Sequence, residues 1–383
     1  MRVAVVGAGP AGSALACHLA KGGAEVAIFD ASHPREKPCG GAVTARARDL
    51  LPAAPVDDPC PGRLVDRCRF EAAEGDAVDV GLPRPVLVAS RRELDGWLLR
   101  RATDAGARHV AERVVEVEAR GRLRTAARRE EVFDVLVGAD GAGSLVRRTL
   151  LGPVPPERLA VAAGWFARGD APMVVRFVPG VAGYLWLFPR PDHVGVGIYA
   201  PLGALPTREL LDRLEREVLR RFPALAEHDG GRYAHTLPSP APDEGSIREI
   251  AGERWALVGD AAALADPITG EGIFSALRSA QLLAETLLSD GSPARYPERV
   301  LEDFGREMLR SAALHARFYA QGFPDRMVRY AAWSPAVRRV LADLVLGEQG
   351  YLDLKRRLLR AAPRFLLDAA RTRLLEGYSF RNG

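Results

Sequence analysis

The first thirty residues constrain the fold more than any other part of the chain. They read RVAVVGAGPAGSALACHLAKGGAEVAIFD after the initial Met, so an apolar run leads through a glycine-rich turn and a small-residue stretch to a second apolar run. This order predicts a strand at 2–6, a helix at 11–21 and a strand at 25–29 that Asp30 closes. Two strands joined by a helix in this way require a parallel sheet with helices packed on it.

The glycines of this turn indicate a bound dinucleotide. Gly7 permits the tight turn, Gly9 lets the backbone approach a pyrophosphate, and Gly12 lets the helix pack closely on the sheet. The N-terminus of the helix then offers unpaired N–H groups to the phosphates. Asp30 is placed to accept hydrogen bonds from ribose hydroxyls, which favours FAD or NAD over NADP.

A second turn of nucleotide-binding type lies far along the chain. Gly259 and Asp260 follow an apolar run at 254–258, and the segment PITGEG precedes a helix predicted at 272–285. Such a turn can place an aspartate at the ribityl and phosphate part of a flavin. The helix N-terminus can direct its N–H groups at the pyrimidine carbonyl, where negative charge gathers on reduction. Together the two turns favour FAD.

The middle of the chain follows a different pattern. Aromatic-bearing, alternating segments at 160–199 predict an antiparallel sheet, and an amphipathic helix is expected at 205–222. A helix at 91–105 and strands at 111–117 and 132–137 are expected before it.

The expected class is α/β, with a Rossmann-type FAD-binding domain, an inserted antiparallel-sheet substrate domain and a C-terminal helical region. The predicted boundaries are 1–155 and 246–296 for the FAD-binding domain, 156–245 with parts of 60–90 for the substrate domain, and 297–383 for the helical region.

Cysteine and histidine usage gives no sign of a disulfide framework or a metal site. The four cysteines, Cys17, Cys39, Cys60 and Cys68, form no CxxC pair, and the seven histidines are scattered. Cys39 is therefore expected to be a free thiol in a reducing cytoplasm. The N-terminus shows no signal-peptide pattern, and no apolar run reaches the roughly 18 residues that a membrane-spanning helix needs.

The net charge of +4 is unevenly distributed, since residues 305–383 hold 15 basic and 7 acidic side chains. A solvated, arginine-rich helix surface is the ordinary interpretation. The alternative is that this basic C-terminal region meets a diphosphate or anionic headgroups, as a peripheral contact with a membrane. No basic stripe with regularly interleaved aromatic residues accompanies the charge, so nucleic acid is the least expected partner. Nothing in the sequence specifies an oligomeric state.

The motifs taken together resemble those of a known group. The turn at 7–12, an Asp-Gly turn at 140–141 and the run at 259–272 resemble the p-hydroxybenzoate hydroxylase-like flavoprotein superfamily. KPCGG at 37–41 and YLWLFP at 184–189, followed by VGVG, narrow the resemblance to the geranylgeranyl reductase family. The resemblance spans nearly the whole chain. It implies a non-covalent FAD and a second, antiparallel domain that forms a substrate cavity over the isoalloxazine.

The resemblance also implies roles for individual residues. Ala11 and Gly12 would meet the pyrophosphate, and Asp30 the adenosine ribose. Arg91 would reach the phosphate or ribityl region, unless it is an ordinary surface arginine at a helix start, and Val114 would contact adenine through its backbone. The predicted cofactor-binding set is Gly7, Gly9, Ala11, Gly12, Asp30, Arg91, Val114, Asp260, Gly272 and Ile273.

The candidate catalytic residues are Cys39, Gly40 and Gly41, because in the family this loop passes close to the flavin and the glycines let its backbone do so. Cys39 would supply a proton to the carbon beside the one that receives hydride, or line the site as a small polarizable wall. The alternative is a buried cysteine that only fills space. Lys37 would lower the pKa of Cys39 or hold a substrate phosphate.

Tyr184, Trp186 and Phe188 alternate along one predicted strand, so their side chains should share one face. Such a face can wall an apolar, chain-like or planar substrate, or it can be ordinary sheet core.

The favoured reaction is reduction of C=C bonds in an isoprenoid or other apolar substrate by hydride transfer from flavin N5. NAD(P)H or a reduced carrier such as a ferredoxin is expected as a transient donor, because no second GxGxxG is present. The alternative is an NAD(P)H-dependent monooxygenase acting on an aromatic or polyketide-like molecule. A flavin halogenase is less favoured, since no lysine lies between Lys37 and Lys355. A non-enzymatic flavin-binding or sensor module is also less favoured, because the sequence shows no appended effector domain.

Overall fold

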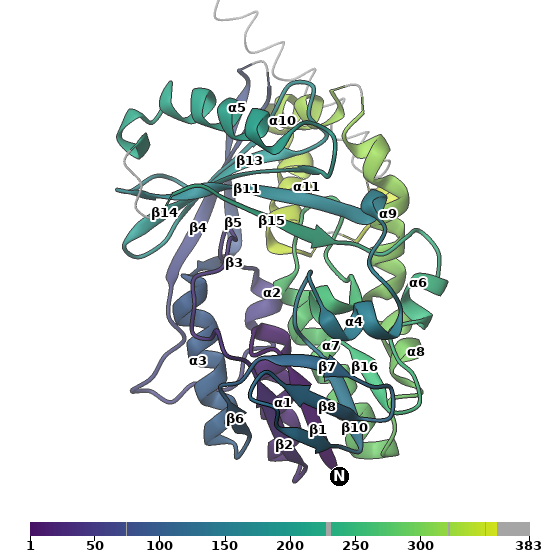
Figure 1. The fold of residues 1–383 in the computed structure, drawn as a ribbon. Coiled ribbons are helices and arrows are strands. Elements are labelled where there is room, and N and C mark those ends of the chain that lie inside the picture. Colours follow the sequence, from purple (N-terminus) through teal and green to yellow (C-terminus); the bar gives the residue numbers. More distant parts are fainter. Residues whose placement is uncertain (74, 227–230, 321, 349, 358–383) are drawn as a thin grey trace, which may run out of the picture.

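The computed structural model describes residues 1–73, 75–226, 231–320, 322–348 and 350–357. Two sheets lie one above the other, with the N-terminus at the base of the lower one (Figure 1). The lower sheet is parallel and the upper one is a larger, mostly antiparallel sheet. Helices of the C-terminal region run along one side of both sheets.

The parallel sheet is the predicted dinucleotide-binding core. Its five strands, all parallel to their neighbours, stand in the order β16 (Trp255–Leu257), β10 (Val135–Gly138), β1 (Arg2–Val6), β2 (Glu25–Phe29) and β6 (Arg108–Val110). The helices that pack with it are α1 (Pro10–Lys21), α3 (Arg91–Asp104) and α7 (Ile273–Asp290). Because parallel strands end at the same edge, the turns after β1, β2, β10 and β16 meet there.

The eight-stranded sheet draws on two separate segments of the chain. Its order is β15 (Tyr233–Pro238), β11 (Leu159–Arg168), β14 (His193–Pro201), β13 (Tyr184–Pro189), β12 (Val174–Phe177), β4 (Arg63–Glu71), β5 (Ala77–Val88) and β3 (Ala42–Val43). All neighbours are antiparallel except β12 and β4, which pair in parallel where the two segments meet.

Helices cover both faces of the eight-stranded sheet. The helix predicted at 205–222 is α5 (Thr207–Leu219), which packs on the outer face. The helices α10 (Phe323–Trp333) and α11 (Pro335–Leu346) cover the inner face near β4 and β5. The inner face over β13 to β15 turns instead toward the parallel sheet.

The strands predicted at 111–117 and 132–137 are divided between two sheets. Residues of the first form β7 (Val114–Val117), which pairs with β8 (Arg122–Thr125) and β9 (Glu130–Val132) in a small antiparallel sheet. The chain then crosses to the parallel sheet at Asp134, whose N–H donates to the carbonyl of Arg2. The single strand predicted at 132–137 is thus replaced by the end of β9 and most of β10 (Val135–Gly138), which belong to different sheets.

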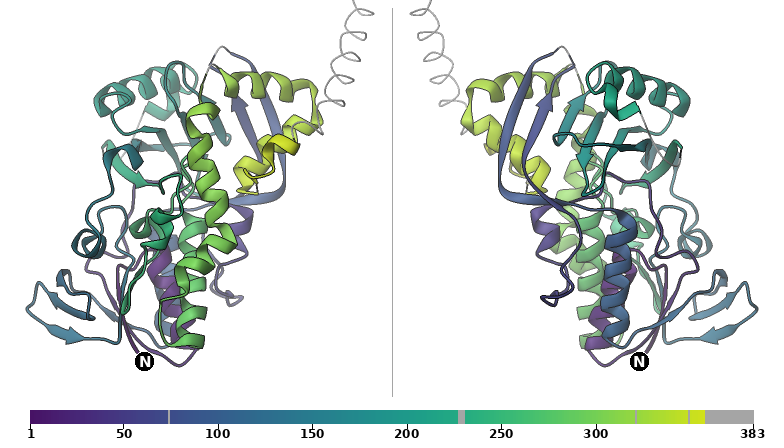
Figure 2. Two further views of the ribbon diagram at one scale, coloured as in Figure 1. Left: turned by 90° about the vertical axis from the view of Figure 1, so that its right-hand side faces the viewer. Right: turned by 90° about the vertical axis from the view of Figure 1, so that its left-hand side faces the viewer.

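A long helical run joins the two sheets. It consists of α8 (Tyr296–Val300), a π-helical turn (Leu301–Gly305) and α9 (Arg306–Phe318) (Figure 2). Its first part is buried in the core of the parallel sheet, and its last residues reach the inner face of the eight-stranded sheet. The remaining α-helices are short: α2 (Ala45–Arg48), α4 (Leu145–Leu150) and α6 (Gly245–Arg248).

The parallel sheet, the large sheet and the helical C-terminal region confirm the predicted α/β class. No helix among the described residues has both the length and the apolar character to cross a membrane.

Candidate functional site

A cavity of about 880 Å³ lies between the carboxyl edge of the parallel sheet and the inner face of the eight-stranded sheet. It collects the site residues predicted from separate motifs, with one exception, Gly12. The predicted residues that line it are Gly7, Gly9, Ala11, Asp30, Lys37, Cys39, Gly40, Gly41, Arg91, Val114, Tyr184, Trp186, Phe188, Asp260, Gly272 and Ile273.

The first turn has the shape that a pyrophosphate needs. Gly7 adopts a φ of +103°, and a Cβ there would lie 2.4 Å from the carbonyl oxygen of Ala139. A Cβ on Gly12 would lie 2.0 Å from the carbonyl oxygen of Gly7, so Gly12 serves the close packing of helix and turn. Above Gly9 a Cβ would meet nothing within 4 Å. The open space therefore lies at the glycine that faces the cavity.

Asp30 is held by partners that the sequence did not reveal. Its Oδ2 accepts hydrogen bonds from the N–H of Ala8 (2.9 Å) and approaches Nδ1 of His33 (2.7 Å), while Oδ1 accepts from Ser32. Burial opposes its charge, but the hydrogen bonds from His33, Ser32 and Ala8 outweigh it and hold the pKa of Asp30 far below its usual range. Asp30 is therefore a fixed negative charge at the end of β2.

Arg91 is not a surface arginine. Its side chain is 6% exposed and makes a bidentate pair with Asp95, with both N–O distances at 2.8 Å. Burial opposes the charge of Arg91, but Asp95 overcomes it and raises the pKa above its ordinary value. Asp95 also lies 3.3 Å from Nε2 of His33, so a buried chain of charges runs from Asp30 to Arg91. The Arg91 guanidinium also lies near the Cys39 sulfur.

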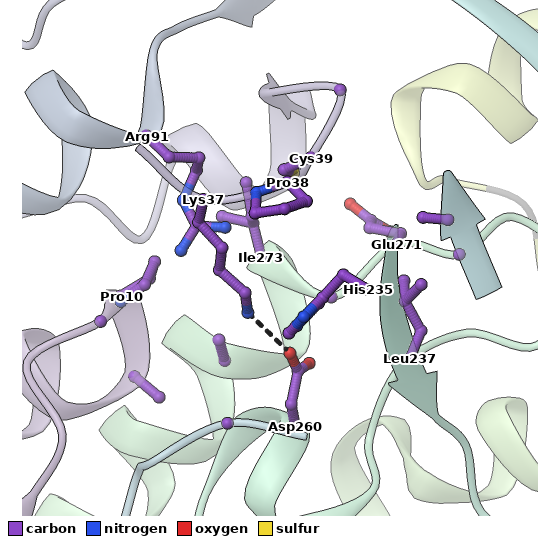
Figure 3. Close-up of a pocket in the computed structure, with 18 of the residues that line it drawn as sticks. Pro10, Lys37, Pro38, Cys39, Arg91, His235, Leu237, Asp260, Glu271 and Ile273 are labelled. Atoms are coloured by element: carbon purple, nitrogen blue, oxygen red, sulfur yellow. Dashed lines mark hydrogen bonds and ion pairs between the residues drawn. The ribbon is translucent and has the colours of Figure 1, made fainter. Parts of the chain in front are cut away.

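A second charged group gathers below the Cys39 loop, where Lys37 extends toward Asp260 and His235 approaches from β15 (Figure 3). Nζ of Lys37 lies 3.2 Å from Oδ2 of Asp260. Burial would raise the pKa of Asp260, but the charge of Lys37 holds it below the usual value. Because its charge is matched by Asp260, Lys37 is less suited to the predicted roles of activating Cys39 or holding a substrate phosphate.

His235 is a residue that the sequence interpretation passed over. Burial, together with the charge of Lys37, lowers its pKa to about 4, so the imidazole is neutral at physiological pH. Its Nε2 is buried without a hydrogen-bond partner. It lines the cavity beside the Lys37–Asp260 pair.

Three tyrosines hold the loop that leads into α7. Their hydroxyls donate to three successive carbonyls: Tyr199 to Pro267 (2.7 Å), Tyr319 to Ile268 (2.6 Å) and Tyr184 to Thr269. With these carbonyls occupied, the loop is fixed just before Gly272 and Ile273, which begin α7 at the cavity wall. Tyr184 therefore contributes its ring to the cavity while its hydroxyl positions this loop.

The two glycines of the Cys39 loop are required because neighbouring atoms of the protein leave no room for a side chain at either position. Gly41 adopts a φ of +81°, and a Cβ there would lie 2.2 Å from the carbonyl oxygen of Ala89. A Cβ on Gly40 would lie 2.6 Å from the ring of Phe188. The N–H of Gly41 donates to the Cys39 sulfur (3.3 Å), which keeps the sulfur at the cavity wall.

Arg190 anchors this loop from the eight-stranded sheet. Its fully buried side chain donates to the carbonyl of Cys39 (2.7 Å) and to Glu36 (2.8 Å), and it stacks on Phe166 at 4.6 Å. Glu36 in turn accepts a hydrogen bond from Ser90, at the start of α3. Arg190 thus links the Cys39 loop to the eight-stranded sheet, and Glu36 links it to the start of α3, which packs with the parallel sheet.

The aromatic strand has the single-faced arrangement that its alternation predicted, since Tyr184, Trp186 and Phe188 all line the cavity. The register places Trp186 opposite Gly197, where a Cβ would lie 2.1 Å from the indole ring. Gly197 of the VGVG segment therefore leaves room for the indole of Trp186. Its Nε1 is buried without a hydrogen-bond partner.

The far end of the cavity, here called the apolar end, is built by β4, β12, α9 and α11. Its side chains are all apolar or aromatic: Phe70, Met173, Val175, Phe177, Phe318, Tyr319, Leu344 and Val345. No motif marked these residues, because their grouping depends on the C-terminal helices folding back onto the sheet. The end with the charged groups is called the polar end, defined by Gly9, Asp30, Lys37, Arg91 and Asp260.

The polar end fits a dinucleotide because open space lies at Gly9 and the N-termini of two helices, α1 and α7, meet that space.

Within the described residues, no group of three or more His, Cys, Asp or Glu side chains is arranged to hold a metal ion.

Comparisons with known proteins agree with this geometry. Residues 5–57 match the model of the NAD(P)-binding Rossmann-like domain family. The menaquinone reductase of Mycolicibacterium smegmatis is 32% identical, over 90% of this chain and 92% of that protein. The chloroplastic geranylgeranyl diphosphate reductase of Oryza sativa is 30% identical, over 76% of this chain and 66% of that protein.

The chain belongs to the geranylgeranyl reductase family of FAD-dependent oxidoreductases. A solved geranylgeranyl bacteriochlorophyll reductase-like protein from Thermoplasma acidophilum superimposes with a TM-score of 0.76 at 21% identity, covering 94% of this chain and 98% of that one, which shows that the fold is shared. FAD is thus the dinucleotide for which the polar end is built.

Proposed function

We propose that this member of the geranylgeranyl reductase family reduces C=C bonds in the isoprenoid chain of its substrate. The observation that carries the proposal is the continuity of the cavity, which runs from the FAD-binding turns, past Cys39, into the apolar end. The similar proteins are named for geranylgeranyl diphosphate and menaquinone, both of which carry polyprenyl chains. An apolar chamber joined to a flavin site suits such a chain.

The reaction adds a hydride to one carbon of the double bond and a proton to the next. FAD, when bound and reduced, supplies the hydride. In this proposal the Cys39 thiol, whose sulfur lies at the cavity wall, would give the proton to the second carbon. Trp186 and Phe188 wall the same space and exclude water from it.

The remaining polar residues keep this arrangement fixed. Arg91 and Asp260 would hold the phosphate and ribityl parts of FAD, because both line the polar end and each is oriented by a charged partner. Arg190 binds the Cys39 carbonyl and so fixes the position of the Cys39 backbone in the cavity wall. The electron donor in this proposal is NAD(P)H or a reduced carrier that binds transiently.

An anaerobic experiment tests the proposal. The purified protein is reduced with dithionite and then offered geranylgeranyl diphosphate or menaquinone. We expect the oxidised flavin spectrum to return and the isoprenoid chain of the product to gain two hydrogens for each double bond reduced; with menaquinone the product is reoxidised to the quinone before its mass is taken, so that reduction of the ring is not counted. Flavin that reoxidises only when O₂ is admitted, with a hydroxylated product, would overturn the proposal in favour of a monooxygenase.

Peripheral contact with a membrane through the basic C-terminal region is a second part of the proposal. Residues 358–383 of that region lie outside the described residues. The support is the excess of basic residues after 305 and the lipid character of the proposed substrate. Sedimentation with vesicles that contain anionic lipid, but not with neutral ones, is the expected result; equal sedimentation with both would contradict it.

A further inference from the structure

The apolar end of the main cavity stops at a wall that it shares with a second, much smaller cavity. The second cavity measures about 10 Å³ and lies among β12, α9, α10 and α11. Phe177, Phe318 and Leu344 line both cavities. These three side chains therefore form a partition between the two spaces.

The partition consists largely of two aromatic rings. Phe177 stands at the end of β12, and Phe318 is the last residue of α9. Their ring centroids are 6.5 Å apart at an interplanar angle of 61°, an edge-to-face contact. Phe318 also meets the ring of Phe323 in α10, with centroids 5.6 Å apart. Phe318 thus lies between a ring of the main cavity and a ring of the second cavity.

The side chains on both sides of the partition are apolar or aromatic, which suits a hydrocarbon. The second cavity is lined by apolar side chains alone, among them Phe323, Met327 and Val340. A space of about 10 Å³ barely admits one water, which would find no polar partner there. The groups that can hold a phosphate or a ribose lie at the polar end. The partition is therefore where the tail of a chain-like substrate ends, rather than its head.

We propose that Phe318, packed against Phe177, is the stop that sets the length of the isoprenoid tail that this protein accepts. The second cavity is the space into which a longer tail would extend if the ring were removed. This inference rests on the proposed function, because it needs a substrate with an isoprenoid tail. It adds a residue that determines which chain length reaches the reacting position productively.

The chain offers a matched control for the test. Phe323 lines the second cavity but not the main one. Phe318→Ala opens the partition between the two spaces, whereas Phe323→Ala removes a ring of equal size from the second cavity and leaves the partition intact. Both variants lose packing and are expected to lower the melting temperature. Only Phe318→Ala should change the tail length that fits.

The experiment compares kcat/KM for farnesyl, geranylgeranyl and geranylfarnesyl diphosphate in the FAD-bound protein. For Phe318→Ala we expect the ratio of the longest substrate to geranylgeranyl diphosphate to rise about tenfold or more, since the two differ by one five-carbon unit and even one methylene in an apolar pocket changes such ratios by about that amount. Phe323→Ala should leave the ratio as it is in the unaltered protein. An unchanged ratio in Phe318→Ala, or an equal rise in both variants, would overturn the inference.

A second substitution approaches the same wall from the other direction. Leu344→Phe adds bulk to a residue that lines both cavities, and it should shift the preference toward farnesyl diphosphate. This keeps the inference open to refutation if Phe318→Ala does not fold. If the unaltered protein reduces none of the three diphosphates and no menaquinone, the proposed function fails instead, and the two failures are distinguished.

Discussion

The two ends of the cavity are held in place by different kinds of interaction. At the polar end, directional contacts fix each functional group: His33 holds Asp30, Asp95 holds Arg91, and Asp260 holds Lys37. At the apolar end, apart from the hydrogen bond of the Tyr319 hydroxyl to Ile268, the side chains set only a shape, because they contact one another by packing. The polar end should therefore tolerate almost no substitution, while the apolar end should change its dimensions when a side chain changes.

The largest effect is expected at the glycine turn. Gly12→Ala places a Cβ 2.0 Å from the Gly7 carbonyl, so helix and turn must separate. We expect a loss of about 3 kcal/mol or more in the free energy of unfolding, and purified protein without FAD. Gly9→Ala is the matched control, because its Cβ meets nothing within 4 Å. That variant should fold with an unaltered melting temperature and bind FAD more weakly, since the methyl occupies the open space; stable, FAD-loaded Gly12→Ala would contradict this view of the turn.

Cys39→Ala is expected to lower turnover by roughly 10²- to 10⁴-fold while FAD stays bound, because the proton donor is lost but the polar end is untouched. Single-turnover reoxidation of the reduced flavin by substrate measures the effect. Cys39→Ser keeps the size of the side chain and a hydroxyl proton, and should recover part of the rate. If Cys39→Ala turns over like the unaltered protein, Cys39 only fills space.

A smaller effect is expected where a charge loses its partner. Lys37→Met leaves Asp260 without its cation in a site where both side chains are less than a fifth exposed, and should cost about 2 kcal/mol in the free energy of unfolding. Adding Asp260→Asn to Lys37→Met should restore part of the loss. Phe70→Leu at the apolar end, by contrast, should cost about 1 kcal/mol and leave FAD binding unchanged. Urea titration of the three proteins decides; a greater cost for Phe70→Leu would reverse the comparison.

The effect that is smallest near neutral pH, and grows as the pH falls, is that of His235. Folding lowers the pKa of His235 from 6.5 to about 4, because burial and Lys37 disfavour the imidazolium. The neutral form is thus favoured in the folded state, and the stability it contributes is complete above pH 6.5 and declines as the pH falls toward 4. In His235→Gln the melting temperature should depend less on pH between about pH 4 and 6.5 than it does in the unaltered protein. An identical pH profile in the variant would show that His235 does not contribute.

The sequence predicted the polar end far better than the apolar end, and the reason is physical. Gly7, Gly9, Asp30 and Asp260 are tied to strand ends by local backbone geometry, so spacing along the chain reveals them. His235 gives no such signal, because its place beside Asp260 arises only when β15 forms part of the cavity wall. The same holds for Phe318, which depends on how a helix far along the chain packs on a sheet. The surface-arginine alternative for Arg91 was wrong, since the buried partner Asp95 lies one helical turn away.

The parallel pairing of β12 with β4 has a consequence for how the polypeptide can be divided. The eight-stranded sheet needs residues 42–88 and 159–238, while the parallel sheet needs strands on either side of both segments and a last one at 255–257. Phe70 must wait for a partner made roughly a hundred residues later during synthesis. We therefore expect that neither sheet can fold from one contiguous fragment of the chain, because each draws its strands from separated segments.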